Sequence, residues 1–319
     1  MRIAVSTNFV RPDTVDQLTR LCEESGVRTV EIWGHDGIFG DAQDLSSIAT
    51  ALQRKSVSVS SLHAPYTVDS LLAAAERDGY LDRFDLAVRQ AVQLGAQYLV
   101  VHPPVINTDQ SLPVRPEQRG GERPGVGLSL SKIMPESFTL WRELAGRAAD
   151  AGLRVAFENL PQSAGWPGGC RVAIVRSIAA ELHDVAAGVC LDLSHCFANG
   201  EQPFAAISGQ GSPRSQGPQG SERSGGLFVP LVIHGSDGIA GSDRHLPPGE
   251  GDCDWDELAA QLCQIGFPGP FVLEVRSPYL DGHLIGRMAQ FVAQRVDRAQ
   301  ERSGARNEER GRNAAFPGD

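Results

Sequence analysis

Short apolar runs alternate with amphipathic stretches along most of the chain. Eight of these runs are rich in β-branched residues and lack the alternation of a half-exposed strand, as is typical of parallel strands buried on both faces. They cover residues 3–6, 28–33, 57–63, 98–102, 154–158, 187–192, 228–234 and 271–275. The pattern therefore predicts eight parallel β-strands.

Between these runs, apolar residues recur at helical spacing. Leu18 and Cys22 share one helical face, and Gly26 follows as a stop signal. A later helix is preceded by Asp254 and Glu257, which have the spacing of a capping pair. Helices and strands thus alternate along the chain.

Eight strands, each followed by a helix, predict a single α/β domain with the (β/α)8 TIM-barrel fold over residues 1–300. The alternative is a doubly wound open sheet, which would place a glycine-rich turn after the first strand. Residues 6–9 are Ser-Thr-Asn-Phe, and the Gly-Val-Gly at residues 125–127 follows no predicted strand. The barrel is therefore favoured, and no nucleotide cofactor is expected.

Three segments interrupt the rhythm. Residues 105–135 form a long polar loop after the fourth strand, and residues 200–226 form a low-complexity insertion after the sixth. The charged tail at residues 301–319 is predicted to be disordered, as is the insertion. The first two segments follow strands, so they would lie near the barrel face where active sites form.

Polar residues that bind metals gather at the predicted strand ends. In a barrel all these ends converge on one mouth. Imidazole and carboxylate groups from several strands are ligands for a divalent ion such as Zn²⁺ or Mn²⁺, and a buried carboxylate is costly unless it is paired. The residues are His63, His102, Glu158, Asp192, His195, His234, Asp243, His245 and Glu274. We therefore expect a metal centre.

The composition of the chain limits the classes of substrate and partner that we expect. The 39 acidic and 29 basic residues give a net charge of −10, which disfavours a nucleic-acid substrate. The six cysteines form no C-x-x-C pair and are expected to be buried or free thiols. With no long apolar run and no secretory pattern at the start, we expect a cytoplasmic protein without membrane contact. An oligomer is compatible with these features.

These motifs resemble the xylose isomerase-like barrels, which include sugar phosphate isomerases and epimerases and the endonuclease IV-type abasic-site nucleases. The resemblance covers the second to eighth strands. In the epimerase branch, one divalent ion (Zn, Mn, Co or Mg) is held by a Glu-Asp-His-Glu set. The resemblance implies that Glu158, Asp192, His234 and Glu274 are the ligands here, that both glutamates transfer protons, and that His195 contacts a small polyhydroxy or sugar-phosphate substrate.

The nuclease branch holds three zinc ions through nine ligands, and all nine residues named above match those positions. The GVCLDLSH and DRH…GEG segments also resemble that branch. The YTVDSLL segment after His63, the HGSDG segment at His234 and the Asp-Trp of GEGDCDW depart from it. These departures and the acidic charge favour the isomerase or epimerase, with the abasic-site phosphodiesterase as the alternative.

In an isomerase, the metal would stabilise enediolate charge while Glu158 and Glu274 take and return the proton. The candidates for a second metal or for substrate contacts are then His63, His102, His195, Asp243 and His245. Trp33 could stack on a sugar ring, and Arg276 could hold an anionic group, although packing and a surface ion pair are their ordinary roles. A third hypothesis is a barrel that binds a sugar or a metal without turnover.

Overall fold

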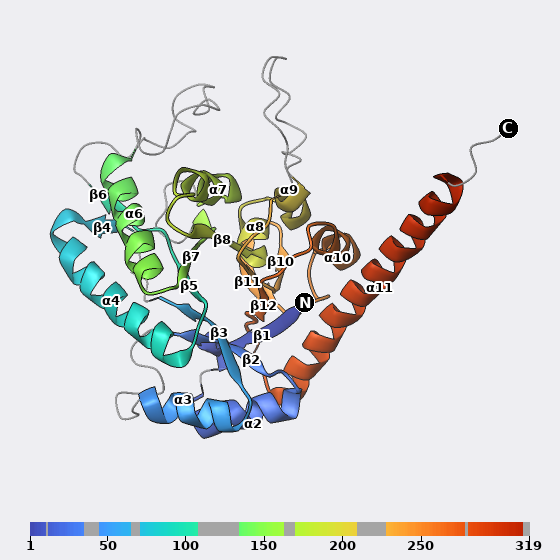
Figure 1. Ribbon diagram of the computed structural model, residues 1–319, viewed down its shortest axis with the longest axis horizontal. Coiled ribbons are helices and arrows are strands. Elements are labelled where there is room, and N and C mark those ends of the chain that lie inside the picture. The colour runs from blue at the N-terminus through green and yellow to red at the C-terminus, as the bar shows by residue number, and fades with distance from the viewer. Residues whose placement is uncertain are drawn as a thin grey trace, which may run out of the picture.

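A computed structural model describes residues 1–10, 12–34, 45–64, 71–107, 134–162, 170–208, 228–277 and 280–314. Eight parallel strands close into a barrel at the centre of the molecule (Figure 1). They are β1 (Arg2–Ser6), β2 (Thr29–Trp33), β3 (Ser58–His63), β5 (Tyr98–Val101), β7 (Arg154–Glu158), β8 (Ala187–Asp192), β9 (Val232–His234) and β12 (Pro270–Leu273). Each strand pairs with the next, and β12 pairs with β1, so the predicted (β/α)8 barrel is confirmed.

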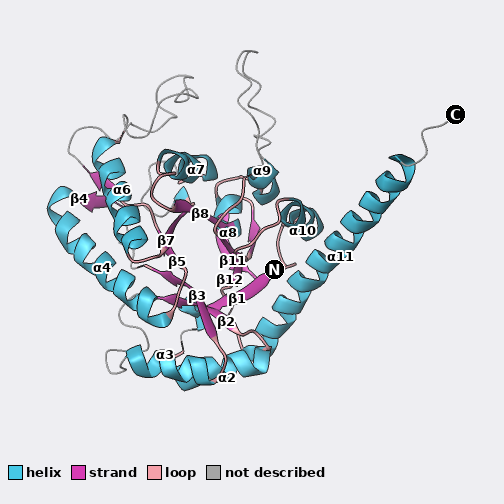
Figure 2. Cartoon of the chain, viewed as in Figure 1, coloured by secondary structure: helices cyan, strands magenta, loops and turns pink. Residues whose placement is uncertain are grey.

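Helices surround the strands on the outside of the barrel (Figure 2). The longer ones are α2 (Val15–Ser25), α3 (Leu45–Arg54), α4 (Arg77–Leu94), α6 (Pro135–Asp150), α7 (Val172–Glu181), α10 (Trp255–Gln264) and α11 (Gly282–Ala314). Short helices are α1 (Thr7–Val10), η1 (Ala74–Glu76), α8 (Leu193–Ala198) and α9 (Pro203–Ser208). Two small sheets pair β4 (Leu71–Ala73) with β6 (Val105–Asn107) and β10 (Asp237–Ile239) with β11 (Ser242–Leu246).

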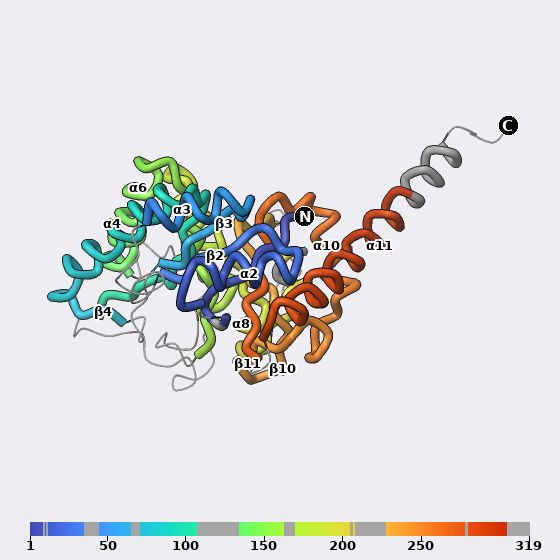
Figure 3. The backbone as a smooth tube through the Cα atoms, turned by 90° about the horizontal axis from the view of Figure 1, so that it is seen from below, coloured from blue at the N-terminus to red at the C-terminus, as the bar shows by residue number. Residues whose placement is uncertain are grey.

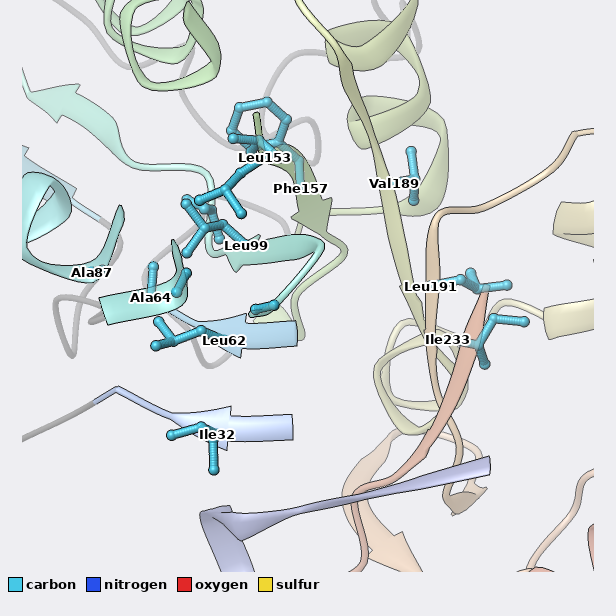
Figure 4. Packing of buried hydrophobic residues seen from close by; sticks show 14 of the residues in the cluster. Ile32, Leu62, Ala64, Ala87, Leu99, Leu153, Phe157, Val189, Leu191 and Ile233 are labelled. Atoms are coloured by element: carbon cyan, nitrogen blue, oxygen red, sulfur yellow. The ribbon is translucent and has the colours of Figure 1, made fainter. Parts of the chain in front are cut away.

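Alternation along the strands divides the core into two layers. On β7, Phe157 belongs to the large cluster between strands and helices, together with Leu62 and Leu99 (Figure 4). Its neighbour Ala156 belongs to a smaller cluster with Val100, which comes from the next strand of the barrel. Because side chains alternate along a strand, Glu158 lies on the same face as Ala156. The strands therefore turn their last polar residues into the barrel mouth.

Local signals set the helix ends as expected. The Asp254 side chain caps α10 by accepting a hydrogen bond from the Glu257 N–H at 3.0 Å. Gly26 ends α2 in the left-handed region with φ of 73°, a conformation that glycine adopts without steric cost. Both residues were predicted to mark helix boundaries.

The structure corrects the predicted irregular segments in part. Residues 105–107 form β6 and residues 203–208 form α9, whereas residues 108–133 and 209–227 lie outside the described residues. Residues 301–314, which belong to the tail that we predicted to be disordered, continue α11, and the red part of this helix leads away from the barrel (Figure 3). Ala, Arg and Glu are strong helix formers and extend a helix that is already nucleated. Residues 315–319 lie outside the description.

The cysteines carry free thiols, and four of them are buried. Across the described ranges, no helix is both long enough and apolar enough to cross a bilayer.

Candidate metal centre

Four ligand-type side chains meet at the carboxyl ends of consecutive barrel strands. Glu158, Asp192 and His234 are the last residues of β7, β8 and β9, and Glu274 follows β12 directly. Each side chain offers a ligand atom, and these atoms lie within 4.8 Å of one another. His234 Nδ1 lies 2.7 Å from Glu274 Oε2, 3.4 Å from Glu158 Oε1 and 3.7 Å from Asp192 Oδ2. We call these four residues the central cluster.

Three atoms of the central cluster are buried and form no hydrogen bond of regular geometry among the residues that the structure describes, although His234 Nδ1 and Glu274 Oε2 are in ion-pair contact. They are Asp192 Oδ2, His234 Nδ1 and Glu274 Oε2. Unpaired buried polar atoms are rare, and each one calls for an explanation such as an ion. A divalent cation would give all three a common partner, and three carboxylates with one imidazole form a chemically suitable ligand set. The residues therefore fit a metal ion.

Three further ligand groups among the described residues share members with the central cluster, and one of them combines Glu158 and His234 with the buried thiol of Cys190. His63 and His102 approach Glu158 Oε2 through their Nε2 atoms, at 3.0 Å and 3.3 Å. Together with Glu158 they form a possible ligand group of their own. On the other side, Asp192 groups with His195 and His245. Among the described residues, Glu158 thus belongs to three of these ligand groups and Asp192 to two.

Asp243 lies beside the group formed by Asp192, His195 and His245. Its Oδ1 lies 3.0 Å from His245 Nε2 and 3.7 Å from His195 Nε2. His195 and His245 come from α8 and β11, and the Ser194 hydroxyl connects the two elements by accepting the N–H of His245 at 2.9 Å. All nine residues predicted from the strand ends therefore lie close together at the barrel mouth, and we call this group of nine residues the basin.

In the basin, the carboxylates and the imidazoles shift one another's pKa values. Burial alone would raise the pKa of Glu158, but the charges of His234 and His102 outweigh it and hold that pKa well below its usual value. Burial alone would lower the pKa of His195, but Asp192 and Glu158 outweigh it and raise that pKa to about 10. Without a metal, protonated His195 and His234 therefore compensate the buried carboxylates, whereas burial lowers the pKa of His102.

Neighbouring amides fix the carboxylates. Asn8 Nδ2 donates to Glu274 Oε1 at 2.9 Å. The side-chain amide of Asn159 donates to the backbone carbonyl of Asp192 and accepts a hydrogen bond from the backbone N–H of Asp192. The backbone carbonyl oxygen of Asn159 also lies 2.8 Å from His195 Nδ1. Sequence reasoning missed Asn8 and Asn159, although an asparagine follows the glutamate in VAFENLP and would have been a signal. It also gave no role to Glu31, a carboxylate inside the apolar run of β2.

The two weaker candidates lie at the edge of the basin. The ring of Trp33 lies against the ring of His63, with a centroid separation of 3.9 Å and a tilt of 33° between the ring planes. Arg276 is exposed, and its backbone N–H donates to the His245 carbonyl at 2.8 Å. Trp33 thus packs against a member of the basin, whereas the Arg276 backbone holds the β11 segment in place.

The GEGDCDW segment has a structural role. The carboxylate of Asp237, on β10, accepts hydrogen bonds from the backbone N–H groups of Gly249 and Cys253 and from the Trp255 indole, at 2.8–3.0 Å. This buried carboxylate closes the loop that follows Asp243 and His245. The GEG segment, which resembles the nuclease branch, therefore reflects the way in which this loop is built, and the segment does not by itself distinguish a nuclease from an isomerase.

We expect Asp237→Asn to destabilise the protein by about 2–4 kcal/mol, because charge-assisted hydrogen bonds are lost and buried donors are left unpaired. Urea denaturation of the metal-free protein measures this loss. Asp252→Asn is the matched control, since its exposed carboxylate accepts one N–H in the same loop. Equal stability of the two variants would contradict the structural role of Asp237.

Comparison with known proteins identifies the family of this chain. The sequence model of the xylose isomerase-like TIM barrel family matches residues 19–296. The chain belongs to this family. An uncharacterised protein of Mycobacterium tuberculosis is 28% identical over 285 residues, covering 86% of this chain and 89% of the relative. A probable endonuclease 4 of Solibacter usitatus is also 28% identical, covering 73% of this chain and 75% of that protein.

Solved structures of low sequence identity share the fold of this family member. A D-tagatose 3-epimerase-like protein superimposes with a TM-score of 0.69 at 18% identity, covering 95% of this chain and 100% of that one. An L-ribulose 3-epimerase gives 0.68 at 14% identity, with 95% and 97% covered. An IolI protein with a bound zinc atom gives 0.65 at 18% identity, with 94% and 99% covered.

Proposed function

We propose that this family member is a divalent-metal-dependent isomerase or epimerase of a small polyhydroxy carbonyl compound, such as a sugar or sugar phosphate. The observation that carries the proposal is the central cluster, in which Glu158 and Glu274 flank His234 Nδ1 and three buried ligand atoms lack hydrogen bonds. The names of the structural neighbours, two of them 3-epimerases or similar to one, support this substrate class.

The two glutamates would divide the proton transfer between them. Glu158 Oε1 and Glu274 Oε2 approach the same nitrogen from different strands, so a substrate carbon between the two carboxylates could lose a proton to one and regain it from the other. Asn8 holds the second oxygen of Glu274 and fixes its orientation. Asp192 and His234 would hold the metal together with the glutamates. When bound, the metal supplies positive charge that stabilises a developing enediolate.

Zinc-dependent phosphodiester hydrolysis of abasic-site DNA is the second candidate. One observation favours it: the outer clusters, His63–His102–Glu158 and Asp192–His195–His245, adjoin the central one and share its carboxylates. Bridging carboxylates are suited to a multi-metal centre that stabilises the attacking and leaving oxygens of a phosphate. The probable endonuclease 4 among the relatives is in keeping with it. The net charge of −10 opposes it, because a duplex is normally bound through basic residues.

Metal content and activity separate the two candidates. We expect the purified protein to hold about one Zn, Mn, Co or Mg ion per chain, because the central cluster alone combines four buried ligands. We expect it to convert a member of a ketose and ketose-phosphate panel. Elemental analysis and chromatographic product assays measure these outcomes. About three zinc ions per chain together with incision of an abasic duplex would overturn the isomerase in favour of the nuclease.

The third hypothesis is a barrel that binds a sugar or a metal without turnover. It predicts that the protein binds metal or sugar but neither converts a ketose nor incises an abasic duplex. Cytoplasmic location and an oligomeric state stay predictions.

A further inference from the structure

Glu31 is a buried carboxylate that the proposed chemistry does not use. It lies on β2, and its side chain is fully inaccessible to solvent. It belongs to none of the ligand clusters found in the described part of the chain. A carboxylate in the interior of a barrel is costly unless a charged or hydrogen-bonded partner compensates it.

The partner of Glu31 comes from a distant strand. Both carboxylate oxygens of Glu31 lie 3.2 Å from Nε2 of His234, which is on β9 and is itself fully buried. In the barrel order, β1 and β12 separate β2 from β9, so this contact spans the barrel interior. Ser61 on β3 donates its hydroxyl to Glu31 Oε2 at 2.8 Å and restrains the carboxylate.

This arrangement divides the two nitrogens of His234 between two tasks. Nε2 faces Glu31, whereas Nδ1 faces Glu158, Asp192 and Glu274 in the central cluster. A carboxylate on one ring nitrogen keeps the proton there and leaves the lone pair of the other nitrogen for a metal. It also increases the basicity of the coordinating nitrogen and fixes the plane of the ring.

We propose that Glu31 is a positioning residue of the metal centre, which orients His234 so that Nδ1 faces the ion. The inference rests on the metal dependence in the proposed function. Glu31 acts through His234 and does not itself contact substrate or metal. Its effect should therefore appear in metal affinity before any question of turnover arises.

Glu31→Gln keeps the shape of the side chain and removes its charge. We expect it to weaken binding of Zn²⁺ by about 10–100-fold, the range measured for partners of metal-binding histidines in other proteins. Competition of the full-length protein with a chromophoric zinc chelator gives the dissociation constant. The ligand-field spectrum of the Co²⁺-loaded protein should change as well, since it reports the geometry of coordination.

Glu143→Gln is the matched control. It removes a partly buried carboxylate that pairs with Arg77 and Arg147 between α4 and α6, outside the barrel. A loss of stability without a loss of zinc affinity is expected there. Should Glu31→Gln fail to fold, Ser61→Ala tests the same chain of contacts, with a smaller loss of affinity expected.

The outcomes are distinct. A wild-type protein that binds zinc, with Glu31→Gln or Ser61→Ala weakening that binding and Glu143→Gln leaving it unchanged, supports the proposal. Wild-type affinity and an unchanged Co²⁺ spectrum in a folded Glu31→Gln variant would overturn it and leave the proposed function standing. A wild-type protein that binds no divalent metal would overturn the metal-dependent function and this inference together.

Discussion

Glu274→Gln is expected to lower the turnover number about 10²–10⁴-fold, the contribution typical of a positioned acid or base. The amide keeps an oxygen in the central cluster, where Glu274 lies 2.7 Å from His234, but it cannot accept and return a proton. Exchange of substrate hydrogen with D₂O, at the carbon next to the carbonyl, should fall in parallel. Steady-state kinetics and NMR measure the two effects.

Two controls keep this result interpretable. Glu250→Gln removes an exposed carboxylate from the loop after β11 and should leave turnover unchanged. Metal content of Glu274→Gln separates loss of the base from loss of the ion. Normal turnover in Glu274→Gln would show that the two-glutamate mechanism is wrong, even if Glu158 proved essential.

The barrel could be predicted because its strands are buried on both faces. Such strands need continuous apolar runs, and those runs mark their own positions in the sequence. The seventh strand shows the limit of the pattern, since the apolar run starts at residue 228 whereas β9 starts at Val232. Pro230 lies between them and has no N–H for a sheet ladder. The Phe228 N–H instead donates to the Ile207 carbonyl.

The members of the candidate site could also be predicted, because the topology of a barrel brings the ends of all its strands to one mouth. Their individual partners could not. Glu31 and His234 are 203 positions apart, and strand position alone does not say which side chains meet across the interior. Similarly, Asp237 and Asp243 are six residues apart on the paired strands β10 and β11. Only the three-dimensional contacts show that Asp237 binds the backbone of the following loop, while Asp243 faces the histidines.

Loss of the His234 side chain should lower the stability of the protein strongly. Its imidazole lies within 3.7 Å of carboxylate oxygens from Glu31, Glu158, Asp192 and Glu274. His234→Ala would leave these buried carboxylates without their shared partner, at a cost of about 3–5 kcal/mol in the metal-free protein. The melting temperature should then fall by about 4–8 °C, because the unfolding entropy of a chain of 319 residues is large. Calorimetry of the chelated protein measures this shift. His183→Ala, which removes an exposed imidazole at the end of α7, should melt like the wild type.

The pH dependence of this loss follows from the directions of the pKa shifts. Burial alone would lower the pKa of His234, but Cys190 and the carboxylates led by Glu31 outweigh it and raise that pKa well above 6.5. Its stabilising contribution is therefore complete below pH 6.5 and is lost as the pH rises through the raised value. For Glu158 the pKa is lowered from 4.5, so its contribution is present above pH 4.5 and is lost in acid. The stability difference between wild type and His234→Ala should thus be greatest between pH 4.5 and 6.5 and should shrink in alkali. A difference that is constant with pH would mean that packing of the ring, and not its charge, supports the barrel mouth.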